Sequence, residues 1–160
     1  MTHTLILSVL LMLGARDDGV LFEEGFDGKI QTPWKWVRED DKEWRIGESA
    51  LHMRSQPGGI WGGNNAKNVL LIRPEKSDNV EARVTVAHVP KKRWEQGGLV
   101  WYVDDDNFVK LISEHIDGKM YVVVASEQRG KGVVHGKVVA PQANMELRLI
   151  VQGKKVIGQW

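Results

Sequence analysis

The chain has 160 residues, a formal net charge of +1 and no cysteine. This length supports one domain with a buried core, and the near-zero charge gives no electrostatic basis for binding nucleic acid or an anionic membrane surface. The absence of cysteine excludes a disulfide scaffold, a thiol nucleophile and a zinc site with cysteine ligands.

The N-terminal residues have the composition of a targeting segment. An apolar run from Leu5 to Leu13 is followed by the small residues Gly14 and Ala15, as at a signal-peptidase site, and it is too short to predict a membrane span. We therefore predict a signal peptide over residues 1–15, a mature domain over 16–160, and export to the periplasm or the extracellular space. The alternative is a buried N-terminal strand, which the lack of Lys and Arg before the run favours.

Short β-like segments recur along the rest of the chain, and helical periodicity is almost absent. In the first half the predicted strands are 20–26, 45–46, 51–54, 69–73 and 80–86. The last of these alternates, with Val80 and Val84 facing inward and Glu81 facing outward. Many short strands separated by Gly, Pro, Asn and Asp indicate one antiparallel β-sandwich.

The most informative pattern is a pair of β-like runs on either side of Asp104–Asp106. With these three residues as the loop, Trp101 pairs with Val109 and Leu99 with Leu111. One face is then apolar and is predicted as core, consisting of Leu99, Trp101, Val103, Val109 and Leu111. The opposite face is mixed and holds Val100, Tyr102, Phe108, Lys110, Ile112 and Glu114.

An Asp-Gly pair at 117–118 predicts a second hairpin with a type I′ turn, which pairs Glu114 with Tyr121. The three strands form a meander with one apolar face and one face suited to a polar ligand. The polar side chains predicted on that second face are Tyr102, Lys110, Glu114 and Tyr121. The alternative is an ordinary solvent-exposed face, with Lys110 and Glu114 as a weak ion pair.

The C-terminal part predicts strands at 133–140 and 145–152, a turn at Gly153-Lys154, and the start of a return strand. The printed sequence ends at Trp160, inside this return strand. We therefore expect that the sequence is truncated at its C-terminus.

Segment 95–111 resembles a motif of the concanavalin A-like sandwich families, in which Gln-Ala-Gly-Leu leads into an aromatic strand, an Asp-rich turn and an Asn-aromatic-aliphatic-Lys-Leu strand. Segments 26–28, 44–51 and 68–71 are similar to other motifs of these families, in the same order. The chain looks most like the family of unknown function that contains regulation-of-enolase-like proteins, and more distantly like the C-terminal sandwich of β-xylosidases. The resemblance implies an all-β, antiparallel concanavalin A-like jelly-roll sandwich. It also implies a sugar-binding module or an accessory domain of a carbohydrate-active enzyme.

Seven tryptophans point to carbohydrate binding, because flat aromatic faces stack on the apolar faces of sugar rings. The tryptophans in or beside predicted loops are Trp34, Trp36, Trp61 and Trp94. Of these, Trp61 is flanked by glycines and asparagines and is best suited to project over a groove. Trp101 is expected in the core, and the alternative for Trp34 and Trp36 is packing against the sandwich.

We therefore predict a non-catalytic carbohydrate-binding or accessory domain whose partner is a carbohydrate or glycan. The predicted ligand-binding residues are Trp61, Asn65, Arg73, Gln96, Tyr102, Lys110, Glu114 and Tyr121. One alternative is a glycoside hydrolase that uses paired carboxylates such as Glu81 and Glu114. Another is a structural or protein-interaction module.

No cofactor is predicted, because the five histidines show no metal-ligand spacing. The Asp104–Asp106 triplet is the one place that suggests calcium, which takes carboxylate oxygens on loops. Asp is also favoured in a hairpin turn for backbone reasons alone, and we favour that interpretation.

Overall fold

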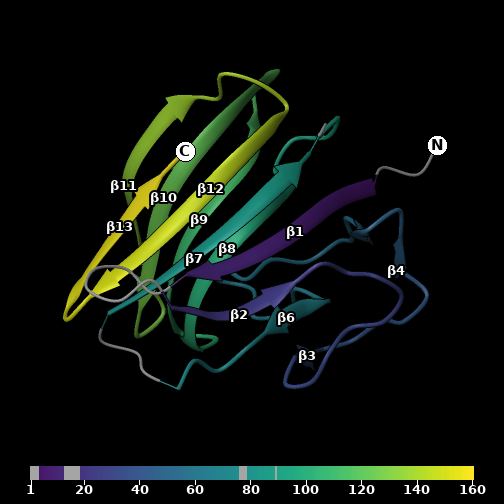
Figure 1. Cartoon of the computed structure of the whole chain (residues 1–160). Coiled ribbons are helices and arrows are strands. Elements are labelled where there is room, and N and C mark those ends of the chain that lie inside the picture. The colour runs from purple at the N-terminus through teal and green to yellow at the C-terminus, as the bar shows by residue number, and fades with distance from the viewer. Residues whose placement is uncertain (1–3, 13–18, 76–78, 89) are drawn as a thin grey trace.

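The computed structural model describes the backbone of residues 4–12 and the whole of 19–75, 79–88 and 90–160. Its strands form two packed antiparallel sheets and a separate two-stranded pair, and no helix occurs among the described residues (Figure 1). The predicted all-β sandwich is confirmed.

The larger sheet has the strand order β13-β12-β7-β1-β5-β4, with β2 also paired to β1. Its strands are β1 (Thr4–Met12), β2 (Val20–Glu24), β4 (Trp44–Gly47), β5 (Ala50–Arg54), β7 (Asn79–Ala87), β12 (Asn144–Gln152) and β13 (Lys155–Gln159).

The smaller sheet has the order β11-β10-β9-β8 and is a simple meander. Its strands are β8 (Gln96–Asp104), β9 (Asn107–Ile116), β10 (Lys119–Gln128) and β11 (Lys131–Val139). The separate pair consists of β3 (Lys35–Val37) and β6 (Val69–Leu71).

The core lies between the two sheets, and the inner strands of both contribute alternate residues to it. Val84 of β7 and Leu147 of β12 pack in one cluster with Leu111 of β9 and Val122 of β10, and all four are at most 1 % exposed. Because successive side chains of a strand point to opposite faces, the residues between them lie on the outer faces of the sandwich.

The predicted register of the meander is confirmed away from the first turn. Trp101 pairs with Val109, and the Asp117-Gly118 turn pairs Glu114 with Tyr121. Both turn residues have positive φ angles, 48° and 81°, as a type I′ turn requires.

The prediction was wrong at Val103. The ladder shifts between Tyr102 and Asp104, so that Asp104 pairs with Asn107 and the loop shrinks to two residues. This bulge leaves Val103 without a place in the core, and its side chain is 70 % exposed.

The segment predicted as a signal peptide falls partly outside the described residues. Its Thr4–Met12 backbone forms β1, which pairs with β7 along one edge and with β5 and β2 along the other. Residues 13–15, where the cleavage site was predicted, lie outside the described part, as does Arg16.

Several tryptophans pack against the core. Trp36 and Trp44 have ring centroids 4.9 Å apart, and Trp34 meets Phe22 edge to face at 5.7 Å. For Trp34 and Trp36 the structure therefore supports the packing alternative, and Trp101, predicted in the core, packs against it while remaining partly buried.

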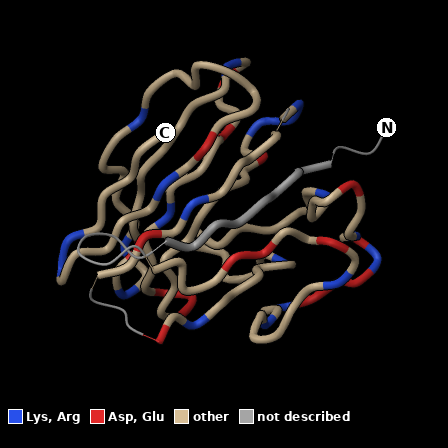
Figure 2. Tube along the Cα trace, in the orientation of Figure 1, with Lys and Arg blue, Asp and Glu red and all other residues tan. Residues whose placement is uncertain are grey.

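Charged residues of both signs are interspersed along the described trace (Figure 2). The outermost strand of the smaller sheet, β11, is exposed along its whole length and pairs through one edge only. It carries the exposed apolar residues Val133, Val134, Val138 and Val139.

Candidate functional site

The outer face of the smaller sheet holds charged residues that are buried. Lys110 and Glu114 of β9 and Glu127 of β10 point away from the core, yet they are only 2 %, 7 % and 3 % exposed. A loop that carries Trp61 lies over part of this face, as its contacts with Lys110 and Glu127 show. Buried ionisable groups are costly unless they are paired, so this cluster needs partners.

Gln96 of β8 supplies the central link of the cluster. The Lys110 ammonium donates a hydrogen bond of 3.0 Å to Gln96 Oε1, and Gln96 Nε2 donates one of 2.5 Å to Glu114 Oε1. The structure thus joins Lys110 and Glu114 through an amide and buries both, which differs from the exposed direct ion pair considered as the alternative. We call Gln96, Lys110, Glu114 and Glu127 the polar cluster.

Burial lowers the pKa of Lys110 from its ordinary value, because the charged form loses its hydration. The negative charges of Glu114 and Glu127 oppose this shift. Lys110 is therefore an ammonium held in a dry environment by two carboxylates, which is the kind of perturbed group that marks functional sites more often than structural ones.

The Trp61 side chain lies directly over this cluster. The Lys110 Nζ atom is 4.7 Å from the centroid of the indole ring, within the range of a cation–π interaction. The backbone N–H of the next residue, Gly62, donates to Glu127 Oε2 at 3.2 Å. Trp61 as a whole is 37 % exposed, so a ligand can reach part of this residue.

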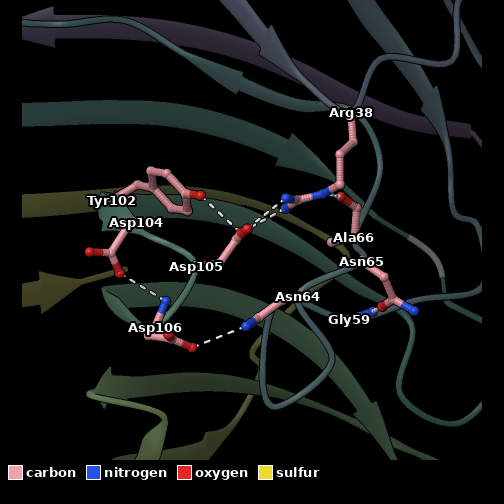
Figure 3. A network of polar contacts seen from close by, with 9 residues as sticks. All are labelled: Arg38, Gly59, Asn64, Asn65, Ala66, Tyr102, Asp104, Asp105 and Asp106. Atoms are coloured by element: carbon pink, nitrogen blue, oxygen red, sulfur yellow. Dashed lines mark hydrogen bonds and ion pairs between the residues drawn. The ribbon is translucent and has the colours of Figure 1, made fainter.

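Residues 57–66, which we call the Trp61 arm, form a loop that closes on itself. Asn65 Oδ1 accepts a hydrogen bond of 2.9 Å from the N–H of Gly59, and the N–H groups of Asn65 and Ala66 both donate to Gly59 O at 3.2 Å. The predicted ligand residue Asn65 therefore shapes the arm, and its Oδ1 is used within it (Figure 3).

Tyr102 belongs to a neighbouring network rather than to the polar cluster. Its hydroxyl donates to Asp105 Oδ1 at 2.8 Å, and the Arg38 guanidinium forms two further hydrogen bonds of 2.8 Å with the same carboxylate (Figure 3). Arg38 holds the pKa of Asp105 below its usual value through these bonds. Sequence reasoning missed Arg38, whose partner is distant in the chain.

The three aspartates of the first hairpin are bonded to protein groups. Asp104 Oδ1 accepts from the Asp106 N–H at 2.9 Å and from Asn107 Nδ2 at 2.7 Å, while Asp106 Oδ1 accepts from Asn64 Nδ2 at 3.0 Å. Across the part of the chain that the structure describes, no group of three or more His, Cys, Asp or Glu residues is placed to hold a metal ion.

The last two predicted residues have different positions. Tyr121 packs against Ile112 and Val123 on the outer face, directly opposite Glu114, and the Lys137 ammonium lies 4.7 Å from its ring centroid. Arg73 is exposed just beyond β6, and no hydrogen bond or ion pair joins it to the polar cluster among the described residues.

Glu81 and Glu114 do not form a carboxylate pair. Glu81 lies on the outer face of the larger sheet, where it forms ion pairs with Arg148 and Arg83, whereas Glu114 lies on the outer face of the smaller sheet. Burial raises the pKa of Glu81, but the two arginines outweigh it and the net shift is downward. The core of the sandwich thus separates the two glutamates.

Sequence reasoning missed Glu127, although the residue alternation along its strand indicates its position. It follows Tyr121, Val123 and Ala125 at the two-residue spacing of one strand face. Extending that alternation by one step would have placed it beside the polar cluster.

No helix long and apolar enough to cross a membrane occurs within the described ranges. Among curated proteins, no match to the chain was found. A family model described as the beta xylosidase C-terminal concanavalin A-like domain matches residues 23–157. The match confirms the predicted sandwich and agrees with the resemblance that we listed as the more distant of the two. The chain therefore belongs to the family of beta xylosidase C-terminal concanavalin A-like domains.

Proposed function

We propose that this domain binds a carbohydrate on the outer face of its smaller sheet, without catalysing a reaction. The observation that carries the proposal is the position of Trp61, whose partly exposed indole stands over a buried cluster of hydrogen-bonding side chains. A flat aromatic face beside convergent polar groups suits a sugar ring, which has an apolar face and a rim of hydroxyls.

The polar cluster has the donors and acceptors that sugar hydroxyls require. Glu114 and Glu127 accept hydrogen bonds, Lys110 donates them, and Gln96 does both. Tyr121, opposite Glu114, adds a second aromatic ring on the same face. The family to which the chain belongs is named for enzymes that act on carbohydrate, which supports the same ligand class.

The geometry of the carboxylates favours binding over hydrolysis. Glu114 and Glu127 share a face, but Glu127 lies six residues along β10 from Tyr121, the partner of Glu114. At about 3.3 Å per residue the two backbones are ~20 Å apart, and Lys110 interacts with both carboxylates from between them, whereas the carboxyl pair of a glycosidase flanks the scissile bond.

Affinity electrophoresis against a panel of soluble polysaccharides tests the proposal. We expect at least one polysaccharide to retard the native protein, and Trp61→Ala to weaken that binding roughly tenfold or more, as expected for a lost stacking platform. Trp94→Ala is the matched control, because Trp94 is also an exposed loop tryptophan, 55 % exposed, whose ring is in contact with the Arg93 guanidinium instead of Lys110. The proposal fails if no polysaccharide binds, or if Trp61→Ala binds as well as the native protein.

Export is a second part of the proposal, supported by the composition of residues 1–15. Its consequence is specific, because cleavage would remove β1 from between β5 and β7. N-terminal sequencing of the protein produced in its natural host shows whether residues 1–15 are cleaved as a signal peptide or retained as part of the sheet. A start near Arg16 supports export, and a start at Met1 supports retention of the strand.

A further inference from the structure

We propose that the Trp61 arm is a lid that opens to admit the ligand to the polar cluster beneath it. The inference rests on the proposed carbohydrate site and concerns how that site is controlled. Four observations carry it: the arm is a self-contained unit, its base is fixed, its contacts with the sheet are few and weak, and it covers groups that are costly to bury.

The arm is built to move as one piece. The two hydrogen bonds from Asn65 and Ala66 to Gly59 O, and the bond from the Gly59 N–H to Asn65 Oδ1, tie its two ends together. A loop whose ends are bonded to each other keeps its shape when its outer contacts break, as compact Ω-type loops do.

The base of the arm is anchored independently of its tip. Arg38 Nε donates a hydrogen bond of 2.7 Å to Ala66 O, and the same arginine is bonded to Asp105 of the first hairpin. Beyond the base, the Asn68 N–H donates to Arg38 O at 3.1 Å, and Asn68 Oδ1 accepts from the Asp40 N–H at 2.7 Å. The tip can therefore swing while the base stays in register.

Four contacts hold the tip against the smaller sheet. They are the Trp61 ring over the Lys110 ammonium, the same ring against Gly132, the Gly62 N–H on Glu127, and Asn64 Nδ2 on Asp106. Residues 61–65 of the tip are all exposed, and the hydrogen bond from Asn64 to Asp106 is exposed as well, so water competes for it. Contacts of this kind open more readily than the strand ladders around them.

The closed arm hides the groups that would bind the ligand. Lys110 and Glu127 are both buried and both contact the arm, so a sugar hydroxyl cannot reach this end of the cluster until the arm lifts. Opening would rehydrate Lys110 and Glu127, which offsets part of the cost of breaking the contacts of the tip. The buried charges thus lower the free energy that is needed to open the arm.

The closed position depends on a glycine of β11. Gly132 pairs with Glu127 in the ladder, and the Trp61 indole packs so closely on it that a Cβ atom there would overlap the Nε1 and Cε2 atoms of the ring. Gly136, on the same strand, has nothing within 4 Å of such a Cβ atom. An alanine at 132 therefore blocks closure, and an alanine at 136 does not.

Amine acylation of Lys110 measures opening without any sugar. Lys110 is 2 % exposed and reacts only when the arm lifts, whereas Lys154 in the β12–β13 turn is exposed and serves as the internal reference. Mass spectrometry after timed acylation gives the ratio of the two rates. We expect Gly132→Ala to raise the relative rate at Lys110 roughly tenfold, as a loss of the closed state requires, and Gly136→Ala to leave it unchanged.

Equal rates in the native protein and in Gly132→Ala would overturn the proposal. A rise in Gly136→Ala equal to that in Gly132→Ala would also overturn it, because the effect would then come from β11 itself. Asn64→Ala provides a second variant outside the sheet, and it must raise the rate at Lys110 with no change in thermal midpoint. Since no sugar is present, a negative result here leaves carbohydrate binding standing, and a failed binding assay leaves the lid standing.

Discussion

The Arg38 guanidinium and the Asp105 carboxylate, 67 residues apart in the chain, meet through two parallel hydrogen bonds of 2.8 Å (Figure 3). Both side chains are less than one-third exposed. Bidentate Arg–carboxylate pairs fix geometry as well as adding energy. Because Arg38 also donates to Ala66 O, this pair links the base of the Trp61 arm to the turn of the first hairpin and fixes the position of the arm relative to the smaller sheet.

The Arg38–Asp105 pair should make stability depend on acid. Because Arg38 lowers the pKa of Asp105 below its ordinary value of 3.8, folding favours the ionised carboxyl. The resulting stabilisation is complete above that ordinary value and is lost as the pH falls through the lower pKa of the folded state. Urea midpoints of the native protein and of Asp105→Asn should differ at pH 7 and converge near pH 2; a constant difference across this range would contradict the prediction.

His88 should destabilise the protein at mildly acidic pH. Burial lowers its pKa from 6.5 to about 4, with Glu95 opposing the shift and His115 adding to it, and the ring is bonded through Nδ1 to Ser113 Oγ at 2.6 Å. The unfolded chain takes up the proton first, so stability falls as the pH drops from 6.5 toward 4, by an amount on the order of 3 kcal/mol. Thermal melts at intervals across this range should show a smaller fall in His88→Asn, which keeps a polar group near Ser113. Parallel curves for the two proteins would assign the fall to other groups.

Gly98 should not tolerate any side chain. Its φ angle is 155°, and a Cβ atom there would overlap Leu111 O and Ile112 Cα on the neighbouring strand. Gly98→Ala must therefore push β8 away from β9, which we expect to cost about 2–4 kcal/mol, as overpacking against backbone does. Chemical denaturation measures the loss, and Gly136→Ala, with open space at its Cβ position, should be nearly neutral.

Gln96 should be critical because it bridges two buried charges. Gln96→Leu removes the acceptor of Lys110 and a donor to Glu114, leaving both charges without that partner. We expect a loss of about 2–4 kcal/mol in the free energy of unfolding. Gln96→Glu restores an acceptor for Lys110 but faces Glu114 with a like charge, so it should recover part of the loss at pH 4 and less at pH 7. Recovery that does not change with pH would rule out this charge-based account.

The sequence predicted the sandwich and much of the site's membership, because alternation and turn chemistry are local signals. The Asp-Gly turn at 117–118 set the register of β9 and β10, which placed Lys110, Glu114 and Tyr121 on one face. The one wrong prediction in this region concerns Val103. It lies in a β-bulge beside the turn, where Asp104 Oδ1 accepts a hydrogen bond from the Asp106 N–H.

Other parts of the site could not be predicted, because they depend on contacts between distant segments. Nothing local indicates that Trp61, in the loop between β5 and β6, covers Lys110 of β9, or that Arg38 reaches Asp105. Lys110 is buried on the outer face of its sheet, with the Trp61 ring against its ammonium, and an alternating strand pattern does not indicate such a contact. The packing of Trp34 and Trp36 likewise depends on partners that the pattern does not identify.

The open edge of β11 bears on how this protein behaves at high concentration. Its unpaired backbone groups and its four exposed valines form a template on which another chain could add, while Lys131 and Lys137 oppose such contacts by like-charge repulsion. Salt shortens the range of that repulsion to about 10 Å at 0.1 M and about 3 Å at 1 M. Concentrated solutions should therefore stay clear in dilute buffer and turn turbid as salt is added.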